Sequence, residues 1–282
     1  MKVFELLRWG KNELKRSPSI YSASLDAKLI LKHILNLDKT EDLVLKGDAV
    51  VGDSAIKKFS EYTRERLGGK PVSKIVHKKF FWKDEFFVNE DVLDPRPETE
   101  ILIEAVIGDH RSSDRLKILD LGTGSGCIII SLLREFQNAD GVAVDISEKS
   151  LMVAMNNATR AGFMPRIKFL RNNWNDGLEE KFDIIVSNPP YIETEKIKLL
   201  NKEIKMYEPL TALDGMEDGL YHYRYLAGNI EKNCKITTRI YLEIGFGQLE
   251  AVKNIFESKG FCPIDTKNDL SGIARVVVFG LK

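Results

Sequence analysis

The sequence is poor in the residues that build disulfide frameworks and zinc sites. It contains only three cysteines and four histidines among 282 residues. The cysteines, at positions 127, 234 and 262, are odd in number and far apart, and the histidines are scattered. This pattern argues against a secreted disulfide scaffold and against a structural zinc site. We therefore expect a reducing compartment and no bound metal.

Long hydrophobic runs are also absent. No apolar stretch approaches the roughly 20 residues that a membrane span requires. The first apolar positions are interrupted by charges at Glu5 and Arg8, which is unlike the apolar core of a signal peptide. These observations predict a cytoplasmic protein without a membrane partner.

The sequence has no net charge overall, but its charge is unevenly distributed. Residues 1–80 hold 17 Lys and Arg against 10 Asp and Glu, an excess of seven positive charges, and the remainder has the opposite excess. One interpretation is that these charges lie on solvated helix faces, which need no partner. The other is that a basic N-terminal domain steers an acidic or polyanionic partner.

The length and the apolar pattern predict two domains. A chain of 282 residues with 43% hydrophobic residues exceeds the usual single compact domain. Apolar residues recur at three- and four-residue spacing up to Leu67, and Gly68-Gly69-Lys70-Pro71 then ends the helical pattern. We predict a helical domain over residues 1–72 and a β-hairpin linker over 73–94, where two aromatic-rich runs flank Lys83-Asp84-Glu85.

Residues 95–282 alternate short apolar strands with amphipathic helices. This alternation predicts an α/β domain with a doubly wound, mixed sheet covered by helices on both faces. The predicted strands are Lys117 to Leu121, Gly141 to Asp145, Arg166 to Leu170, Phe182 to Ser187, Arg239 to Ile244, Phe261 to Asp265 and Ala274 to Phe279.

A glycine-rich loop follows the first predicted strand of this domain. Gly122-Thr123-Gly124-Ser125-Gly126 leads into an apolar helix, and glycines allow the backbone to turn tightly and approach a ligand. A dinucleotide site would have its third glycine at the position of Cys127, and no Gly-Lys-Ser/Thr phosphate loop is present. The spacing therefore excludes a P-loop and disfavours a dinucleotide site.

A carboxylate, Asp145, stands at the end of the second strand. Ligands of doubly wound sheets bind at this edge, where a carboxylate can accept hydrogen bonds from both hydroxyls of a ribose. The alternative is a glycine turn next to an unrelated helix-capping aspartate. The pair resembles the cofactor site of class I S-adenosylmethionine methyltransferases, and this resemblance implies S-adenosyl-L-methionine as cofactor and S-adenosyl-L-homocysteine as product. The residues it assigns to the cofactor are Gly122, Thr123, Gly124, Ser125, Gly126, Asp145, Ile146, Asn173, Trp174 and Asn188.

Asn173 and Trp174 follow the third strand, where such enzymes contact adenine. An amide can accept from the exocyclic amine while an indole packs beside the ring. Relatives often carry aspartate where this chain has Asn173.

The run Asn188-Pro189-Pro190-Tyr191 ends the fourth strand. Two prolines fix the backbone and leave carbonyl groups free to accept. The Asn188 side-chain oxygen and the Pro189 carbonyl can take the two hydrogens of an NH₂ group on a planar carbon, and Tyr191 can stack on its plane. Such dipoles stabilise the positive charge that grows on nitrogen during methylation. The alternative is a rigid exit from the strand, for which Pro-Pro is also suited.

Three further segments narrow the resemblance. Together with Asn188 to Tyr191 and the helical domain, residues 92–100 (Val-Leu-Asp-Pro-Arg-Pro-Glu-Thr-Glu), residues 207–215 and Asp218-Gly219-Leu220 resemble the release-factor glutamine methyltransferase family, known as PrmC or HemK. The similarity covers nearly the whole chain.

That resemblance implies methylation at N5 of the glutamine in the Gly-Gly-Gln motif of class 1 peptide chain release factors. Asn188, Pro189, Pro190 and Tyr191 would be the catalytic and substrate-binding residues, Arg96 would lie beside the substrate, and residues 1–72 would recognise the release factor. For Pro97-Glu98-Thr99-Glu100 the alternative is an ordinary helix start, with proline and acids in the first turn.

Two other functions remain open at this point. The Asn188 to Tyr191 loop also suits an N6-adenine or other nucleic-acid amino methyltransferase, but the chain has no Lys/Arg-rich recognition insert. We therefore do not expect nucleic acid as the substrate. A cofactor-binding regulatory module without catalysis would not need the proline-rich acceptor loop.

Overall fold

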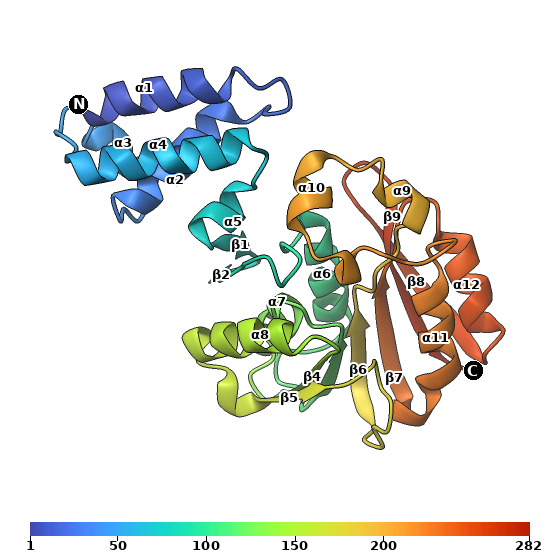
Figure 1. Ribbon diagram of the computed structural model, residues 1–282. Coiled ribbons are helices and arrows are strands. Elements are labelled where there is room, and N and C mark those ends of the chain that lie inside the picture. The colour runs from blue at the N-terminus through green and yellow to red at the C-terminus, as the bar shows by residue number, and fades with distance from the viewer. The chain divides into compact units, whose positions relative to one another are not determined.

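The computed structural model describes residues 1–282 and divides into two compact units (Figure 1). The first, the helical unit, comprises Met1–Lys78 together with Asn201–Tyr207. The second, the α/β unit, comprises Lys79–Leu200 and Glu208–Lys282. The helical unit thus extends past the predicted end at residue 72 and takes in a short segment from far along the chain.

The helical unit is built on amphipathic helices whose apolar sides form one core. Leu6, Leu14, Ile30 and Phe59 are buried in it, at the spacing that the sequence shows. Gly10 allows helix α1 to pack closely against Phe59 of α4, because a Cβ atom at Gly10 would lie 2.5 Å from the Phe59 ring. The helices of this unit are α1 (Val3–Leu14), α2 (Ala23–Ile34), α3 (Asp42–Leu45), α4 (Asp53–Leu67), α5 (Val72–Val76) and α10 (Lys202–Tyr207).

A buried arginine ties the inserted segment to this unit. Arg66 Nε donates to Asp26 at 2.6 Å, and Arg66 Nη1 donates to Glu203 at 2.7 Å. The side chains of Arg66 and Asp26 are only 6% and 7% exposed. Because a buried cation is costly without partners, both carboxylates are needed to hold it in place.

Asp26→Ala is therefore expected to destabilise the helical unit, because it leaves the buried charge of Arg66 with one carboxylate instead of two. The expected loss is about 3 kcal/mol of unfolding free energy. Chemical denaturation followed by far-UV circular dichroism measures it. An unchanged midpoint would show that Glu203 alone satisfies Arg66.

The predicted hairpin is present and belongs to the α/β unit. Strands β1 (Lys79–Phe81) and β2 (Asp84–Phe86) pair antiparallel. Trp82 at its turn donates from Nε1 to Glu135 at 2.7 Å, and Asp84 pairs with Arg134. The hairpin is thus anchored to helix α7 (Cys127–Glu135) of that unit.

The predicted α/β fold with a mixed sheet is confirmed. Seven strands form one sheet in the order β5-β4-β3-β6-β7-β9-β8, and all neighbours are parallel except at β9. The last strand of the chain lies between β7 and β8, an order that the sequence did not predict. The strands are β3 (Lys117–Leu121), β4 (Asp140–Asp145), β5 (Ile167–Arg171), β6 (Phe182–Ser187), β7 (Cys234–Glu243), β8 (Phe261–Asn268) and β9 (Ala274–Leu281).

Helices cover both faces of the sheet because strand side chains alternate between two apolar cores (Figure 1). Ile118 of β3 faces the first core, and its neighbour Leu119 faces the second. The first core includes α6 (Glu100–Asp109), α7 (Cys127–Glu135) and α8 (Glu148–Ala161), and the second includes α11 (Tyr221–Asn229) and α12 (Leu249–Glu257).

The remaining elements are short. They are the 3-10 turns η1 (Pro97–Thr99), η2 (Met164–Arg166), η3 (Leu210–Ala212) and η4 (Glu231–Asn233) and the helix α9 (Thr194–Ile197). None of the helices combines the length and the apolar character that crossing a membrane requires.

Candidate active site

The carboxyl ends of four parallel strands bring the predicted site residues together. Leu121 at the end of β3 is in register with Ser187 of β6 on one side and with Val144 of β4 on the other. The Ser187 hydroxyl donates to the Leu121 carbonyl at 2.7 Å, which locks the two strand ends. The loops that follow these strands therefore start side by side at one edge of the sheet.

The glycine loop turns back over the end of β4. The backbone N–H groups of Gly122 and Thr123 both donate to the Val144 carbonyl at 2.9 Å. Gly122 has a φ of 76° and Gly124 a φ of 55°, conformations that residues with a Cβ rarely adopt. A Cβ at Gly122 would also lie 3.4 Å from the Trp174 ring. Glycine is thus required here by backbone shape.

The third glycine of the loop, Gly126, has a different structural role. Gly126 has a φ of 78° and directly precedes helix α7, and a Cβ there would lie 3.2 Å from Ala154 of α8. It does not line the cavity described below. Gly126 therefore serves the close packing of two helices.

Asp145 holds the loop with the same carboxylate that was predicted to bind ribose. Its Oδ2 accepts from the Gly124 N–H and its Oδ1 from the Ser147 N–H, both at 2.9 Å. Burial raises the pKa of Asp145, and these backbone donors oppose that rise. Each carboxylate oxygen can accept a second hydrogen bond, so the residue still has acceptors for a ligand.

A second acid, Asp120, forms a hydrogen bond with the glycine loop. It is fully buried in β3 and accepts from the Thr123 hydroxyl at 2.6 Å. Burial raises its pKa to about 7, opposed by that hydroxyl and reinforced by the charge of Asp145.

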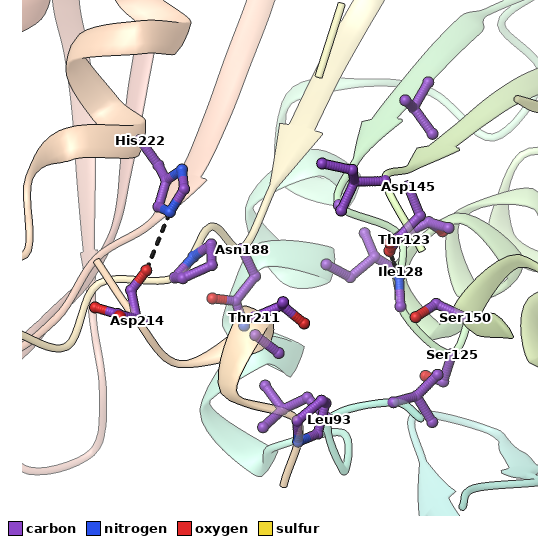
Figure 2. Close-up of a pocket in the computed structure, with 18 of the residues that line it drawn as sticks. Leu93, Thr123, Ser125, Ile128, Asp145, Ser150, Asn188, Thr211, Asp214 and His222 are labelled. Carbon is purple, nitrogen blue, oxygen red and sulfur yellow. Dashed lines mark hydrogen bonds between the residues drawn. The ribbon is translucent and has the colours of Figure 1, made fainter. Parts of the chain in front are cut away.

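One cavity of about 460 Å³ lies at this edge of the sheet. Figure 2 shows Asn188 between Thr123 of the glycine loop and Asp214 and His222 on the opposite wall. The predicted site residues that line the cavity are Arg96, Gly122, Thr123, Gly124, Ser125, Asp145, Ile146, Asn173, Trp174, Asn188 and Pro190. Pro189, Tyr191 and Gly126 are not among the lining residues.

Tyr191 is instead packed against Gln248 and Gly245. Its carbonyl accepts from Gln248 Nε2 at 3.0 Å, and a Cβ at Gly245 would lie 2.9 Å from its ring. Burial raises the pKa of the Tyr191 hydroxyl, which stays protonated. These contacts fix the backbone that carries Asn188.

The side chain of Asn188 is held by residues that the sequence did not single out. Its Nδ2 donates to the Thr99 hydroxyl at 3.3 Å, and that hydroxyl donates to Glu243 at 2.6 Å. Because Nδ2 is engaged by Thr99, the amide oxygen of Asn188 is left as the acceptor for another group.

Arg96 belongs to a hydrogen-bonded group of residues at the cavity. Its Nη2 donates to Glu208 at 2.8 Å, and the other oxygen of Glu208 accepts from the Asp94 N–H at 3.2 Å. The Glu208 side chain is only 2% exposed, although Arg96 remains 34% exposed. Glu208 therefore joins the segment before α6 to the segment after α10.

The opposite wall is aromatic. His222 lies 5.3 Å from Trp174 between ring centroids, and its Nε2 contacts the Asp214 carbonyl at 3.1 Å. Because a carbonyl can only accept, Nε2 carries the hydrogen. Burial lowers the pKa of His222, so the ring is neutral at pH 7.

Asn173, predicted to contact adenine, donates from Nδ2 to Asp176 at 3.1 Å.

The whole chain was compared with known proteins. The "Release factor glutamine methyltransferase" of Caulobacter vibrioides is 38% identical over 270 residues, an alignment that covers 95% of this chain and 93% of that protein. The chain belongs to the release factor glutamine methyltransferase family.

Other comparisons agree with this family. Residues 5–76 match the family described as PrmC N-terminal domain, and residues 89–205 match the Methyltransferase small domain. A "Bifunctional methyltransferase" of Rickettsia felis is 38% identical over 92% of this chain, and the chain spans 54% of that relative's length. The crystal structure of a methyltransferase from Pyrococcus furiosus superposes with a TM-score of 0.53 at 16% identity, covering 78% of this chain and 98% of that one, which shows the shared fold.

Several lining residues in this family member carried weak or no signals in the sequence. Leu210, Thr211 and Asp214 fall in the segment 207–215 that was noted only for its resemblance. His222 and Tyr225 belong to helix α11 and have no motif around them. Their one-sided placement on a helix that starts at the edge of the sheet is the only clue.

Proposed function

We propose that this chain transfers a methyl group from S-adenosyl-L-methionine to the side-chain amide N5 of the glutamine in the Gly-Gly-Gln motif of class 1 peptide chain release factors. Similarity over nearly full length to proteins named "Release factor glutamine methyltransferase" supports a glutamine of a release factor as the substrate. The observation that carries the chemistry is the Asn188 amide, held at the cavity wall by Thr99 with its oxygen left to accept.

The lining residues fit the cofactor. Gly122 and Gly124 expose backbone without a side chain, and Asp145 offers carboxylate oxygens for a ribose. Ile146 and Trp174 provide apolar surface for a planar base. When bound, the cofactor supplies a methyl group on a positively charged sulfur.

The residues of the chain would then orient the target amide. Its nitrogen is a poor nucleophile because the lone pair is delocalised into the carbonyl. The Asn188 oxygen would accept one hydrogen, so that the lone pair of the nitrogen turns toward the line of transfer. The second acceptor was predicted to be the Pro189 carbonyl, but Pro189 does not line the cavity, so the proposed mechanism depends on Asn188. The dipole of the Asn188 amide is fixed before the reaction and stabilises the positive charge that develops on nitrogen.

A nucleic-acid amine is the alternative acceptor. The decisive experiment is transfer of labelled methyl to a purified release factor in the presence of equal masses of bare DNA and RNA. We expect label on the protein alone. Label on DNA or RNA with none on the protein would replace the proposed substrate.

We further propose that the helical unit recognises the release factor and that the reaction takes place in the cytoplasm. All lining residues of the cavity belong to the α/β unit. A chain that begins at Lys79 is therefore expected to bind the cofactor with nearly the affinity of the full chain, while methylation of the intact factor falls steeply.

Calorimetry with the cofactor and initial rates with the factor separate these two effects. A full-length chain carrying Asp26→Ala is the matched control, because it perturbs the helical unit without removing it. Normal methylation of the intact factor by the truncated chain would rule out a recognition role.

A further inference from the structure

Glu243 is a buried carboxyl group behind the candidate active site. It ends strand β7, where its neighbour Leu242 is in register with Ser187, the residue before Asn188. Glu243 is only 2% exposed, and Tyr241, Leu242 and Ile244 around it are fully buried apolar or aromatic residues. A carboxyl group is costly at such a position, because burial removes it from water.

The contacts of Glu243 lead to Asn188. Thr99 donates its hydroxyl hydrogen to Glu243 Oε2 at 2.6 Å, and the same oxygen of Thr99 accepts from Asn188 Nδ2 at 3.3 Å. A hydroxyl has one hydrogen to give, so its donation to Glu243 turns a lone pair toward Asn188. The three groups form a relay from amide to hydroxyl to carboxyl, and the Asn188 side chain also acts on Glu243 directly, as a hydrogen-bond donor that lowers the pKa of this carboxyl.

The relay determines how the Asn188 amide is held at the cavity wall. Thr99 and Asn188 both line the cavity, whereas Glu243 does not. With Nδ2 held by Thr99, the Asn188 amide cannot flip without losing that bond. Hydrogen bonds in such chains polarise one another, so a carboxylate at the far end makes the amide oxygen a stronger acceptor.

We infer that Glu243 is a positioning residue which, through Thr99, fixes and polarises the Asn188 amide so that its oxygen accepts a hydrogen of the target nitrogen. This inference rests on the proposed function. Structural need alone does not explain the carboxyl, because an apolar side chain would pack in this core without the cost of burial. Arg275, whose charge acts on Glu243, forms its own ion pair with Asp269 at 2.8 Å.

The protonation of Glu243 gives the relay a pH dependence. Burial raises its pKa to about 7, the Thr99 hydroxyl opposes this, and the charge of Glu98 adds to it. As the pH rises through about 7, Glu243 becomes a carboxylate and a better acceptor for Thr99. The rate should therefore rise with pH through this range. The charged and titratable groups that act on Glu243 are Glu98 before α6, Cys127 on α7, Tyr191 after β6, Tyr223 on α11 and Arg275 on β9.

The first test compares Thr99→Val with Thr99→Ser in the full chain, using single-turnover methyl transfer to a release factor at saturating cofactor. Valine has the shape of threonine without the hydroxyl, so the rate should fall about 5- to 30-fold, which corresponds to one lost hydrogen bond. Serine keeps the hydroxyl and should restore most of the rate. The concentration of the factor that gives half of the maximal single-turnover rate should change little in either variant.

Thr238→Val is the matched control for loss of a buried hydroxyl. Thr238 is also on β7 and 1% exposed, but its hydroxyl donates to the Phe182 carbonyl and it does not line the cavity. It should lower thermal stability and leave the rate and its pH dependence unchanged. Equal losses of rate in Thr99→Val and Thr238→Val would mean that the hydroxyl of Thr99 is merely structural.

The second test is the pH profile of Glu243→Gln. Glutamine can still accept from Thr99 but is neutral at every pH, so the rise in rate between about pH 6 and pH 8 should disappear and the rate should stay near the low-pH value of the unaltered chain. Asp120, whose pKa is also raised to about 7, is unchanged in this variant. An intact rise in Glu243→Gln would overturn the inference and assign the rise to another group.

Failure of the relay and failure of the proposed function give different results. If the unaltered chain places no methyl group on the release factor, the proposed function is wrong. If it does, and Thr99→Val retains the full rate, only the relay is wrong.

Discussion

Replacement of Asn188 by alanine is expected to lower the rate of methyl transfer to a release factor by about 10²- to 10³-fold, the usual cost of losing one preorganised hydrogen-bonding partner of a transition state. The change removes an acceptor from the cavity wall and leaves the glycine loop and Asp145 in place. Because the interaction strengthens as charge grows on nitrogen, kcat and kcat/KM should fall together while KM for the factor changes little. Steady-state kinetics with labelled cofactor measure this.

Asn188→Asp is the sharper control. It keeps an acceptor of similar shape, but it cannot donate to Thr99 when ionised, and it adds a negative charge beside a positively charged cofactor. That charge stabilises the ground state as well as the transition state, so activity should lie between those of Ala and Asn. Full turnover by Asn188→Ala would show that the loop is structural only.

Asp145→Ala is expected to weaken cofactor binding by about 1.5 to 3 kcal/mol, or roughly 10- to 100-fold. The carboxylate has two functions in this account, since it would accept from the ribose and it already accepts from the Gly124 and Ser147 N–H groups. Its loss therefore removes ligand acceptors and loosens the loop at once. Isothermal titration calorimetry gives the affinity, and circular dichroism checks that the variant is folded.

Asp145→Asn separates the two functions. The amide oxygen can still accept from one backbone donor, while the negative charge and the second acceptor are lost, so the affinity should lie between those of the alanine variant and the unaltered chain. Unchanged cofactor affinity in folded Asp145→Ala would remove Asp145 from the site.

The sheet was predictable because its strands are short apolar runs bounded by turn residues. The predicted strand from Lys117 to Leu121 has the bounds of β3, and β6 likewise runs from Phe182 to Ser187. The order of the last strands was not predictable, because β9 pairs not only with β8, its neighbour in sequence, but also with β7, from which it is separated by α12 and β8. The inclusion of residues 201–207 in the helical unit depends on Glu203 and Arg66, which are separated by 137 positions.

Within the site, the motif residues at the strand ends were predictable, but the residues that hold them in place were not. A loop of three glycines looks uniform in sequence, yet Gly126 packs against Ala154 while Gly122 and Gly124 line the cavity. The partner of a buried carboxyl group such as Glu243 depends on which turn passes over the strand end, and no local pattern encodes that. Thr99 was noted as part of the segment 92–100 that carries the family resemblance, with a helix start as the alternative, and its hydrogen bonds to Asn188 and Glu243 were not predicted.

The position of the transferred methyl group tests the account most directly. A release factor treated with the chain and cofactor is digested, and the peptide that contains Gly-Gly-Gln is sequenced by tandem mass spectrometry, beside a factor whose glutamine is replaced by alanine. We predict one added methyl group on the side-chain nitrogen of that glutamine, and none on the alanine factor. An unmodified Gly-Gly-Gln peptide, or equal labelling of the alanine factor, would contradict the proposed function.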